Sequence, residues 1–216
     1  MFSHRVLAYS QPITTIKPGE YLVSQEDIII STVLGSCIAV AMYDASTGIG
    51  GLNHFMLPGA FHPKRPPKPG QQGYPIIESD PQDFLEDSAR YGMYAMEVLI
   101  NGLLHLGARR NDLAAKVFGG ASVLGFGRDG RRTVAQSNIE FVFEYLETEK
   151  IPIITSDVGG YEARKILFFV KEGKVLLKRI KGTFTDQIAQ EEHLYEERLK
   201  AKPVDGSVHF FTEGQT

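Results

Sequence analysis

The chain has 216 residues, a formal net charge of −3 and one cysteine, Cys37. A chain of this length can bury most of its apolar surface in one domain, and it lacks the basic field that attracts a protein to nucleic acid or acidic membranes. One cysteine excludes an internal disulfide, and no apolar run reaches the roughly 18 residues that span a bilayer. The first residues also lack the apolar stretch of a secretory signal, so we expect a cytoplasmic protein whose partner is a protein or a small molecule.

The N-terminal part predicts an arm followed by strands. Residues 1–19 contain two prolines and no sustained period, which predicts an arm that leads to a first short strand at residues 21–24. Residues 27–34 form a continuous apolar run, typical of a strand buried on both faces. Gly35 and Ser36 follow at once, and neither has the bulk to shield the backbone, so a ligand could approach the N–H groups there closely.

A hairpin is predicted around a turn-like segment at residues 44–48, because an apolar run lies on each side of it. A turn centred on Ala45 and Ser46 would place Cys37 directly opposite His54. Opposed residues on antiparallel strands have Cβ atoms roughly 4.5–5.5 Å apart, close enough for a thiol to hydrogen-bond an imidazole. A slip of one residue would instead put the two side chains on opposite faces.

The segment after this hairpin is rich in proline. Five prolines lie between residues 58 and 70, which excludes a helix or a central strand there. The segment is either a mobile flap over the Cys37–His54 pair or a tolerated surface insertion, and the sequence leaves both open.

Helices and strands interleave in the rest of the chain. Residues 87–106 carry apolar side chains at helical spacing and end at Gly107, which predicts a long core-facing helix. Its predicted core side chains are those of Tyr91, Tyr94, Ala95, Val98, Leu99, Leu103 and Leu106. Residues 116–120 predict a strand that runs into a glycine-rich loop, and the S-x-x-E sequence of residues 137–140 predicts a capping box that opens a second helix.

The C-terminal third predicts a hairpin and an outer helix. Strands are expected at residues 151–155, 164–170 and 174–180, the last two joined by a turn at Glu172 and Gly173. Residues 185–200 predict a mostly charged helix on the outside of the domain. We therefore expect a mixed α/β (α+β) fold: a layered sandwich of mixed β-sheets with flanking helices, in a single domain.

Cys37 and His54 are the residues with the clearest chemical potential. A thiol becomes a strong nucleophile when a base or a positive charge lowers its pKa, and His54 is the nearest base in the predicted hairpin. On these residues alone, the alternative stays open that Cys37 is a small buried hydrophobe and His54 a hydrogen-bonded core histidine.

Metal and nucleotide sites are not supported. His4, His62, His105, His193 and His209 lie in unrelated contexts, and the sequence has no H-E-x-x-H and no cysteine pair, so we predict no metal site. The glycine-rich loop at residues 119–127 lacks G-x-x-x-x-G-K-[ST] and the acidic residue of a dinucleotide site. This favours a structural loop or one wall of a cleft, and no cofactor is expected.

Two blocks of sequence resemble a known family. The blocks are TVLGSCIAVAMYD at residues 32–44 and GIGGLNHFMLP at residues 48–58, and they are similar to the CheD family of chemoreceptor glutamine deamidases in bacterial chemotaxis. The similarity continues through KVFGGA at residues 116–121, IPI at residues 151–153 and DVGG at residues 157–160. It implies a deamidase domain at residues 20–182 with an insertion at 59–86, an arm at 1–19, and a C-terminal helical extension and tail at 183–216.

The resemblance implies a cysteine-dependent amidohydrolase, a protein-glutamine glutaminase, whose nucleophile and base are Cys37 and His54. It also implies a threonine on the strand entering the cysteine, which orients the histidine; Ser31 and Thr32 both fit the spacing, and we prefer Thr32. The family's usual Gly-x-Arg-Asn step reads AQSN at residues 135–138, which leaves the loop contacts there open.

The implied substrate is the cytoplasmic helical domain of a chemoreceptor, with no membrane insertion by the enzyme itself. Backbone N–H groups of Ser36 and Cys37 would stabilise the oxyanion while a glutamine is converted to glutamate through a thioester. Family members also bind a CheC-type phosphatase, which makes such a protein a candidate partner. Two other classes stay open: a non-catalytic signalling module that binds this phosphatase, and a transglutaminase-like acyl transferase that passes the thioester to an amine.

Overall fold

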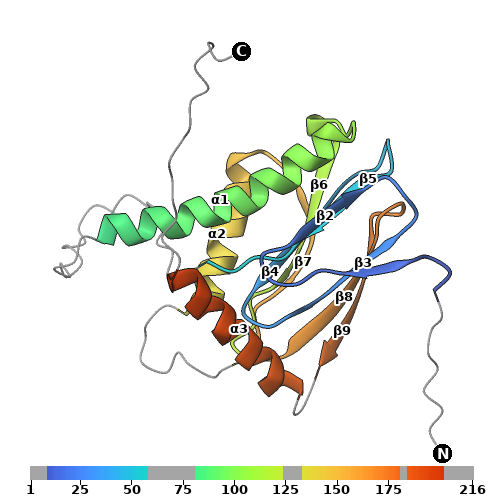
Figure 1. The fold of residues 1–216 in the computed structure, drawn as a ribbon. Coiled ribbons are helices and arrows are strands. Elements are labelled where there is room, and N and C mark those ends of the chain that lie inside the picture. The colour runs from blue at the N-terminus through green and yellow to red at the C-terminus, as the bar shows by residue number, and fades with distance from the viewer. Residues whose placement is uncertain (1–8, 58–80, 124–132, 181–183, 202–216) are drawn as a thin grey trace, which may run out of the picture.

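Two β-sheets and three helices form the fold, in the order that Figure 1 shows. The computed structural model describes residues 9–57, 81–123, 133–180 and 184–201. One sheet has the order β1-β3-β8-β9 and the other the order β2-β5-β4-β6-β7. The strands are β1 (Ile13–Thr15), β2 (Tyr21–Ser24), β3 (Ile29–Leu34), β4 (Ile38–Asp44), β5 (Ile49–Asn53), β6 (Leu113–Gly119), β7 (Ile153–Val158), β8 (Ala163–Phe169) and β9 (Lys174–Ile180); the α-helices are α1 (Pro81–His105), α2 (Val134–Thr148) and α3 (Phe184–Ala201), and a 3-10 turn, η1 (Arg110–Asp112), precedes β6.

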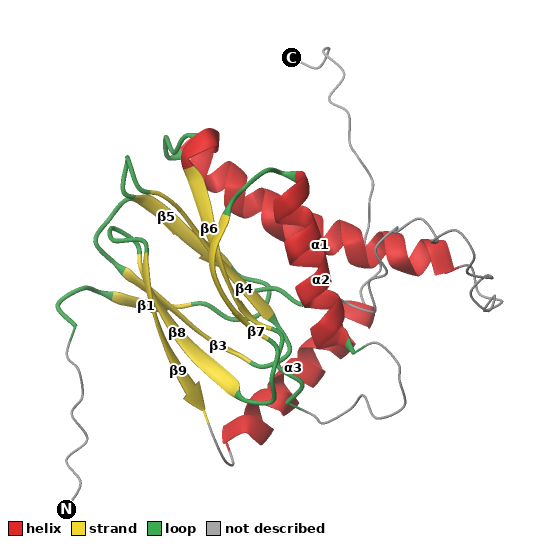
Figure 2. Cartoon of the chain, turned by 180° about the vertical axis from the view of Figure 1, so that it is seen from behind, coloured by secondary structure: helices red, strands yellow, loops and turns green. Residues whose placement is uncertain are grey.

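The elements are stacked in three layers. Figure 2 shows the two sheets face to face, with α1 and α2 covering the outer face of the five-stranded sheet. Side chains of β4 alternate between the two resulting cores: Ile38, Val40 and Met42 pack toward the helices, and Ala39 and Ala41 pack toward the four-stranded sheet. Each sheet contains both parallel and antiparallel pairs, since β1 runs parallel to β3 and β6 parallel to β7. The expected layered mixed α/β fold in one domain is confirmed.

The predicted β4–β5 hairpin is present, but its register differs from the prediction by two residues. Asp44 pairs with Ile49 rather than with Thr47, so four residues form the turn, and Ile38 bridges Phe55. The reason is the Asp44 carboxylate, which accepts hydrogen bonds from the backbone N–H groups of Ser46 and Thr47 and so organises a longer turn. A shift of two residues keeps every side chain on its face, so Cys37 and His54 are diagonal neighbours on the inter-sheet face.

The second helix begins one turn earlier than predicted. Its N-cap is Thr133, whose hydroxyl accepts the N–H of Gln136 at 3.2 Å, while the Gln136 side chain accepts the N–H of Thr133 at 3.0 Å. The capping box predicted at Ser137 and Glu140 is therefore wrong. T-x-x-Q meets the same requirement as S-x-x-E, and starting there leaves Ser137 and Asn138 buried inside the helix.

Other boundaries differ in smaller ways. Residues 13–15, within the predicted arm, form β1, an exposed edge strand. The sequence did not predict it because a proline lies close to it on either side. The first helix begins at Pro81 rather than Asp87, and Tyr94 is 66% exposed instead of facing the core. The strand at residues 21–24, the β8–β9 hairpin and the C-terminal helix are confirmed within one or two residues.

Some predictions concern residues outside the described part of the chain. The proline-rich segment at 58–70, most of the predicted insertion and the second half of the glycine-rich loop fall there. Among the helices that the structure describes, none has both the length and the apolar character needed to span a bilayer.

Asp44 offers a test of the turn that sets the hairpin register. Its carboxylate is buried and also accepts the backbone N–H of Arg109 at 2.9 Å. Replacing it by Ala leaves these N–H groups without an acceptor, so Asp44→Ala should lower the free energy of unfolding by about 1–3 kcal/mol in urea denaturation. Asp112→Ala, which breaks only a surface ion pair with Arg109, should change it by about 1 kcal/mol or less. Equal effects of the two changes would contradict this role of the Asp44 turn.

Candidate active site

Cys37 lies in the connection that carries the chain from one sheet to the other. β3 belongs to the four-stranded sheet and β4 to the five-stranded sheet, and residues 35–37 cross between them. The cysteine is fully buried, and its carbonyl accepts the N–H of Gly120 at 2.7 Å. A Cβ on Gly119 would lie 2.0 Å from that carbonyl oxygen, and the φ of Gly119 is 115°, so only glycine fits against the Cys37 backbone.

The glycine-rich loop thus begins as a support for the cysteine. The N–H of Ala121 donates to the carbonyl of Gly35 at 2.7 Å, one residue after the Gly120 contact. The backbone of residues 119–121 therefore holds both ends of the crossing segment. This agrees with the expected structural role of the first part of that loop.

His54 follows β5 directly and is held by the β1–β2 connection. Its N–H donates to the carbonyl of Glu20, and its carbonyl accepts the N–H of Gly19. Both bonds orient the backbone, so the buried ring has little freedom to leave the inter-sheet face.

The Thr32 hydroxyl sets the tautomer of His54. It donates its single hydrogen to the carbonyl of Ile16 at 2.8 Å, because a carbonyl can only accept. The 2.7 Å contact between Thr32 Oγ1 and His54 Nδ1 is then an N–H donated by the ring. The proton is fixed on Nδ1, and Nε2 keeps its lone pair.

Ser31 does not share this contact. Neighbouring residues on a strand point to opposite faces, and the buried Ser31 hydroxyl makes no hydrogen bond with any residue that the structure describes. Of the two residues that fitted the spacing, Thr32 is the one whose side chain reaches His54.

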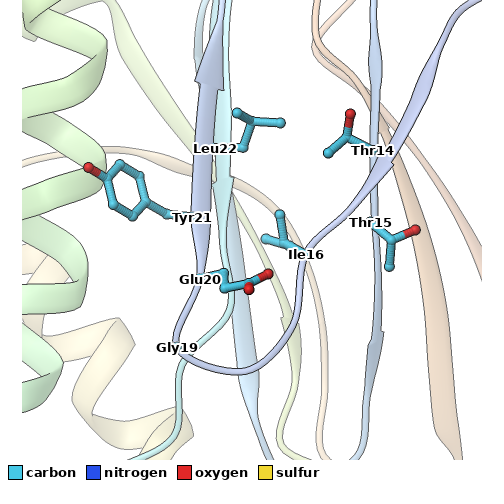
Figure 3. A pocket seen from close by; sticks show the side chains of 7 residues that line it. All are labelled: Thr14, Thr15, Ile16, Gly19, Glu20, Tyr21 and Leu22. Atoms are coloured by element: carbon cyan, nitrogen blue, oxygen red, sulfur yellow. The ribbon is translucent and has the colours of Figure 1, made fainter.

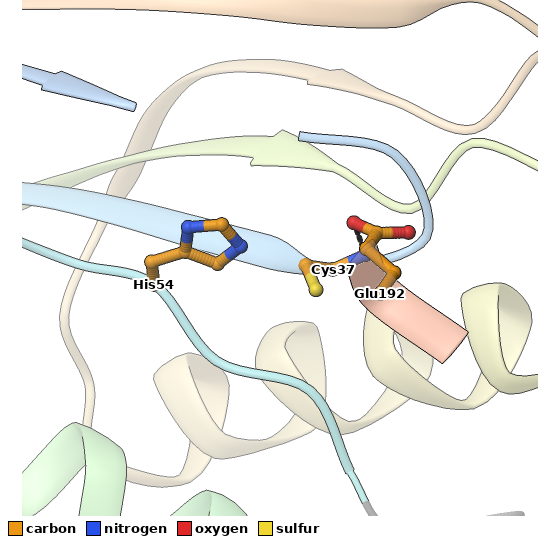
Figure 4. Close-up of side chains that lie close together, drawn as sticks. All are labelled: Cys37, His54 and Glu192. Carbon is orange, nitrogen blue, oxygen red and sulfur yellow. Dashed lines mark hydrogen bonds between the residues drawn. The ribbon is translucent and has the colours of Figure 1, made fainter. Parts of the chain in front are cut away.

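The thiol, the imidazole and a third group meet in one cluster. The sulfur of Cys37, a ring nitrogen of His54 and a carboxylate oxygen of Glu192 lie within 4.8 Å of one another, and Figure 4 shows one ring nitrogen facing the sulfur. His54 Nε2 is buried and makes no hydrogen bond to a described residue. The structure therefore brings together the predicted pair, Cys37 and His54, and adds Glu192.

Glu192 comes from α3, which lies across the end of the sheets where β3 ends (Figure 1). Its Oε1 accepts the N–H groups of Gly35 at 2.9 Å and Cys37 at 3.2 Å. Its Oε2 accepts the N–H of Ser36 at 2.6 Å and the Ser36 hydroxyl at 2.7 Å. We call the three backbone N–H groups of residues 35–37 the N–H cluster; the sequence predicted the Ser36 and Cys37 donors, and Gly35 adds a third.

Asn138 fixes the crossing segment from the other side. Its Nδ2 donates to the carbonyl of Ser36 at 2.8 Å, and its Oδ1 accepts the N–H of Leu57 at 2.8 Å. One buried amide thus connects the Ser36 loop to the chain that continues from His54. The sequence singled out Asn138 only as part of a family motif, because no local signal reveals a contact over about a hundred positions.

Burial keeps both reactive groups neutral in this state. It lowers the pKa of His54 from 6.5 to about 3, so the imidazole is uncharged at neutral pH. Burial, followed by the negative charge of Glu192, raises the pKa of the Cys37 thiol well above its ordinary value. The site thus pairs a protonated thiol with a neutral base whose free nitrogen faces it.

Among the described residues, Cys37, His54 and Glu192 lie close enough together to be considered as ligands of a metal ion. Thiolate, imidazole and carboxylate suit zinc, but both Glu192 oxygens already accept hydrogen bonds from the N–H cluster. A zinc ion bound to Glu192 would have to displace those hydrogen bonds. The geometry of Glu192 is therefore that of a carboxylate held by backbone N–H donors.

A separate depression lies at the β1–β2 connection, lined by Thr14, Thr15, Ile16, Gly19, Glu20, Tyr21 and Leu22 (Figure 3). None of the three clustered side chains lines it. Its link with the site is structural, because Ile16 accepts the Thr32 hydroxyl and Gly19 donates to the His54 carbonyl.

Comparison with known proteins points to one family. A family model described as CheD chemotactic sensory transduction matches residues 75–179. A probable chemoreceptor glutamine deamidase CheD 1 of Dechloromonas aromatica is 43% identical over 196 residues, which cover 91% of this chain and 87% of that protein. The chain belongs to the CheD family. The family that the resemblance of residues 32–58 implied is thereby confirmed.

Other relatives cover the chain equally well. A probable chemoreceptor glutamine deamidase CheD of Methylobacillus flagellatus is 43% identical over 91% of this chain and 88% of its own length. A CheD 1 of Shewanella oneidensis with the same description is 40% identical over 95% of this chain and 90% of its own length. This CheD chain and these relatives therefore correspond over nearly their whole lengths.

The buried imidazole predicts how stability depends on pH. Between pH 6.5 and about 3 the unfolded chain binds a proton at His54 that the folded chain excludes, so the free energy of unfolding falls as pH falls through this window. His54→Gln should remove that part of the slope in urea denaturation followed across the window. His193→Gln, which changes an exposed histidine of α3, should leave it in place. A His54→Gln variant with the wild-type slope would show that His54 titrates normally.

Proposed function

We propose that this CheD chain is a protein-glutamine deamidase that converts glutamine side chains in the cytoplasmic helical domain of chemoreceptors to glutamate. The observation that carries the proposal is the N–H cluster beside a thiol whose neighbouring imidazole has a free Nε2. Relatives described as probable chemoreceptor glutamine deamidases support the same substrate class.

The first step is attack by Cys37 on the side-chain amide carbon of the glutamine. His54 Nε2 takes the thiol proton as the sulfur–carbon bond forms, because the thiolate is the nucleophilic species. The amide oxygen becomes an oxyanion, and the N–H cluster donates to it. Donors fixed by the fold need no reorganisation as this charge develops, which lowers the barrier.

The second step is loss of ammonia. An amide nitrogen leaves poorly as an anion, so His54 returns the proton to it as the carbon–nitrogen bond breaks. Thr32 holds the ring with the proton of Nδ1 directed away from the reaction, so that Nε2 serves as base and then as acid. The result is a thioester on Cys37 and one molecule of ammonia.

The third step is hydrolysis of the thioester. His54 takes a proton from water, the water oxygen attacks the thioester carbon, and the sulfur–carbon bond breaks to release glutamate. The proton returns to Cys37, so the net reaction consumes one water and produces one carboxylate and one ammonium ion. No cofactor takes part in this sequence.

The proposal extends to partners and location. A chemoreceptor helical domain is the proposed substrate, a CheC-type phosphatase is the proposed second partner, and the cytoplasm is the proposed location, since both interactions would occur there. The roles of nucleophile for Cys37, base for His54 and positioning residue for Thr32 belong to the same proposal.

The test is release of ammonia from a purified receptor fragment. Cys37→Ala should reduce the rate to background because the nucleophile is lost. The loss of stability should be small, because a single buried atom is removed, and the urea midpoint checks that the variant still folds. Mass spectrometry should show the unit mass gain of glutamine to glutamate only with the wild type. Incorporation of added methylamine in place of hydrolysis would instead identify an acyl transferase, and ammonia release by Cys37→Ala would refute a thioester.

Thr32 provides a second test, of positioning. Thr32→Val keeps the shape but removes the hydroxyl, so the proton is no longer fixed on Nδ1 and kcat should fall roughly 10- to 100-fold. Thr32→Ser, which restores the hydroxyl, should recover most of the rate, and Ser31→Ala should not lower it. Equal rates for Thr32→Val and Thr32→Ser would exclude this role of the hydroxyl.

A further inference from the structure

Glu192 is buried in a helix that otherwise faces solvent. Of the α3 side chains that the structure describes, it is the one that is buried, with 4% of its surface exposed, while Leu194 is 53% exposed. An ordinary surface helix buries apolar side chains and exposes its carboxylates. The buried carboxylate indicates that α3 is attached through Glu192 as well as through the half-buried Tyr195, which packs against the inter-sheet core.

The carboxylate does not assist the histidine. Thr32 already satisfies His54 Nδ1, and both oxygens of Glu192 are bonded to the N–H cluster and the Ser36 hydroxyl. Glu192 therefore occupies the donors that the reaction needs for its oxyanion, within 4.8 Å of the nucleophilic sulfur (Figure 4). A glutamate side chain is also the chemical product of glutamine deamidation.

We propose that α3 is a built-in product mimic that closes the active site, with Glu192 in the place of the glutamate that the enzyme makes on a receptor helix. This inference rests on the proposed function and adds to it the regulation of the site and the form of its substrate. A helix carries the carboxylate into the site, so the site accepts a glutamine presented on the exposed face of an α-helix. The receptor helix and α3 exclude each other.

The fit of α3 is local and specific. A Cβ on Gly35 would lie 2.6 Å from Glu192 Oε2, so the small residue before the nucleophile permits the carboxylate to approach. One turn further along the same helix face, the Tyr195 hydroxyl contacts the Tyr91 hydroxyl of α1. These two polar contacts, of Glu192 and of Tyr195, can be exchanged for those of another helix.

The closed state also disables the thiol electrostatically. The titratable groups around Cys37 are His54, Glu192 and Glu196 of α3, and the tyrosines Tyr91 and Tyr195. Glu192 and Glu196 both disfavour the thiolate. Removal of α3 by a substrate helix takes away these charges at the moment the glutamine arrives.

The first experiment measures access to the sulfur without any substrate. Glu192→Ala in the full chain should raise the rate of Cys37 alkylation by iodoacetamide about tenfold or more, because each unit fall in thiol pKa gives about ten times more thiolate. Glu191→Ala is the matched control, since it removes the same charge from the exposed neighbouring position. Glu192→Ala should also deamidate a receptor fragment faster than the wild type. Wild-type rates in both assays would overturn closure by α3.

The second experiment tests whether the side chain at position 192 occupies the position of the reaction product. Glu192→Gln presents a carboxamide to the same donors, so Cys37 should convert it back to glutamate, with a unit mass gain in the intact protein and one equivalent of ammonia. The conversion should be independent of protein concentration and absent when Cys37→Ala is added. Persistence of the carboxamide in a Glu192→Gln variant that still deamidates receptor would overturn the product-mimic geometry.

The two proposals fail in distinguishable ways. Faster alkylation of Glu192→Ala without receptor deamidation by either protein would leave closure by α3 standing and remove the deamidase function. Receptor deamidation at equal rates by the wild type and Glu192→Ala, with equal alkylation, would leave the function standing and remove the closure.

Discussion

The site depends on backbone N–H groups that belong to neither sheet. Where the chain passes from β3 to β4 it leaves one hydrogen-bond ladder before it enters the other, and residues 35–37 contribute their N–H groups to neither. Buried N–H groups require acceptors. A segment held rigid by Gly120, Ala121 and Asn138 cannot turn these donors outward, so they form a fixed cluster of partial positive charge. That cluster determines which ligands can bind where the chain crosses from one sheet to the other.

The reactive groups are divided between the two sheets. Cys37 and His54 come from the five-stranded sheet and its extension, and Thr32 comes from the four-stranded sheet. The hydrogen bond from His54 to Thr32 therefore crosses the core of the sandwich. Correct protonation of the imidazole requires the two sheets to be packed in register, so the chemistry of the site depends on the packing of the whole inter-sheet core.

The sequence could predict the parts of the site that local patterns control. Alternation along residues 37–57 predicted Cys37 and His54 on one face of the hairpin. This prediction is correct although the predicted register is wrong by two residues, because side chains return to the same face every two positions. The strand before Cys37 was predicted from its continuous apolar run, and the Ser36 and Cys37 donors from the small residues there and from the family resemblance. Ser31 and Thr32 could be separated only once the strand was placed against β8 and the opposite sheet.

Long-range contacts account for what the sequence could not predict. Glu192 lies 155 positions beyond Cys37, and its helix has the composition of an ordinary charged surface helix, so nothing local indicates a buried carboxylate. Two competing capping signals lay four residues apart, at Thr133 and Ser137, and α2 begins after the first, which leaves Asn138 buried inside the helix. The exposed edge strand β1 was missed because it has only three residues between two prolines and is defined by its pairing with β3.

One consequence concerns the end of each catalytic cycle. The three backbone groups of the N–H cluster can only donate, and Ser36 alone among these residues offers a group that also accepts. Donors hold an anion more firmly than a neutral amide. A glutamate side chain at these donors is therefore held more tightly than a glutamine in the same position.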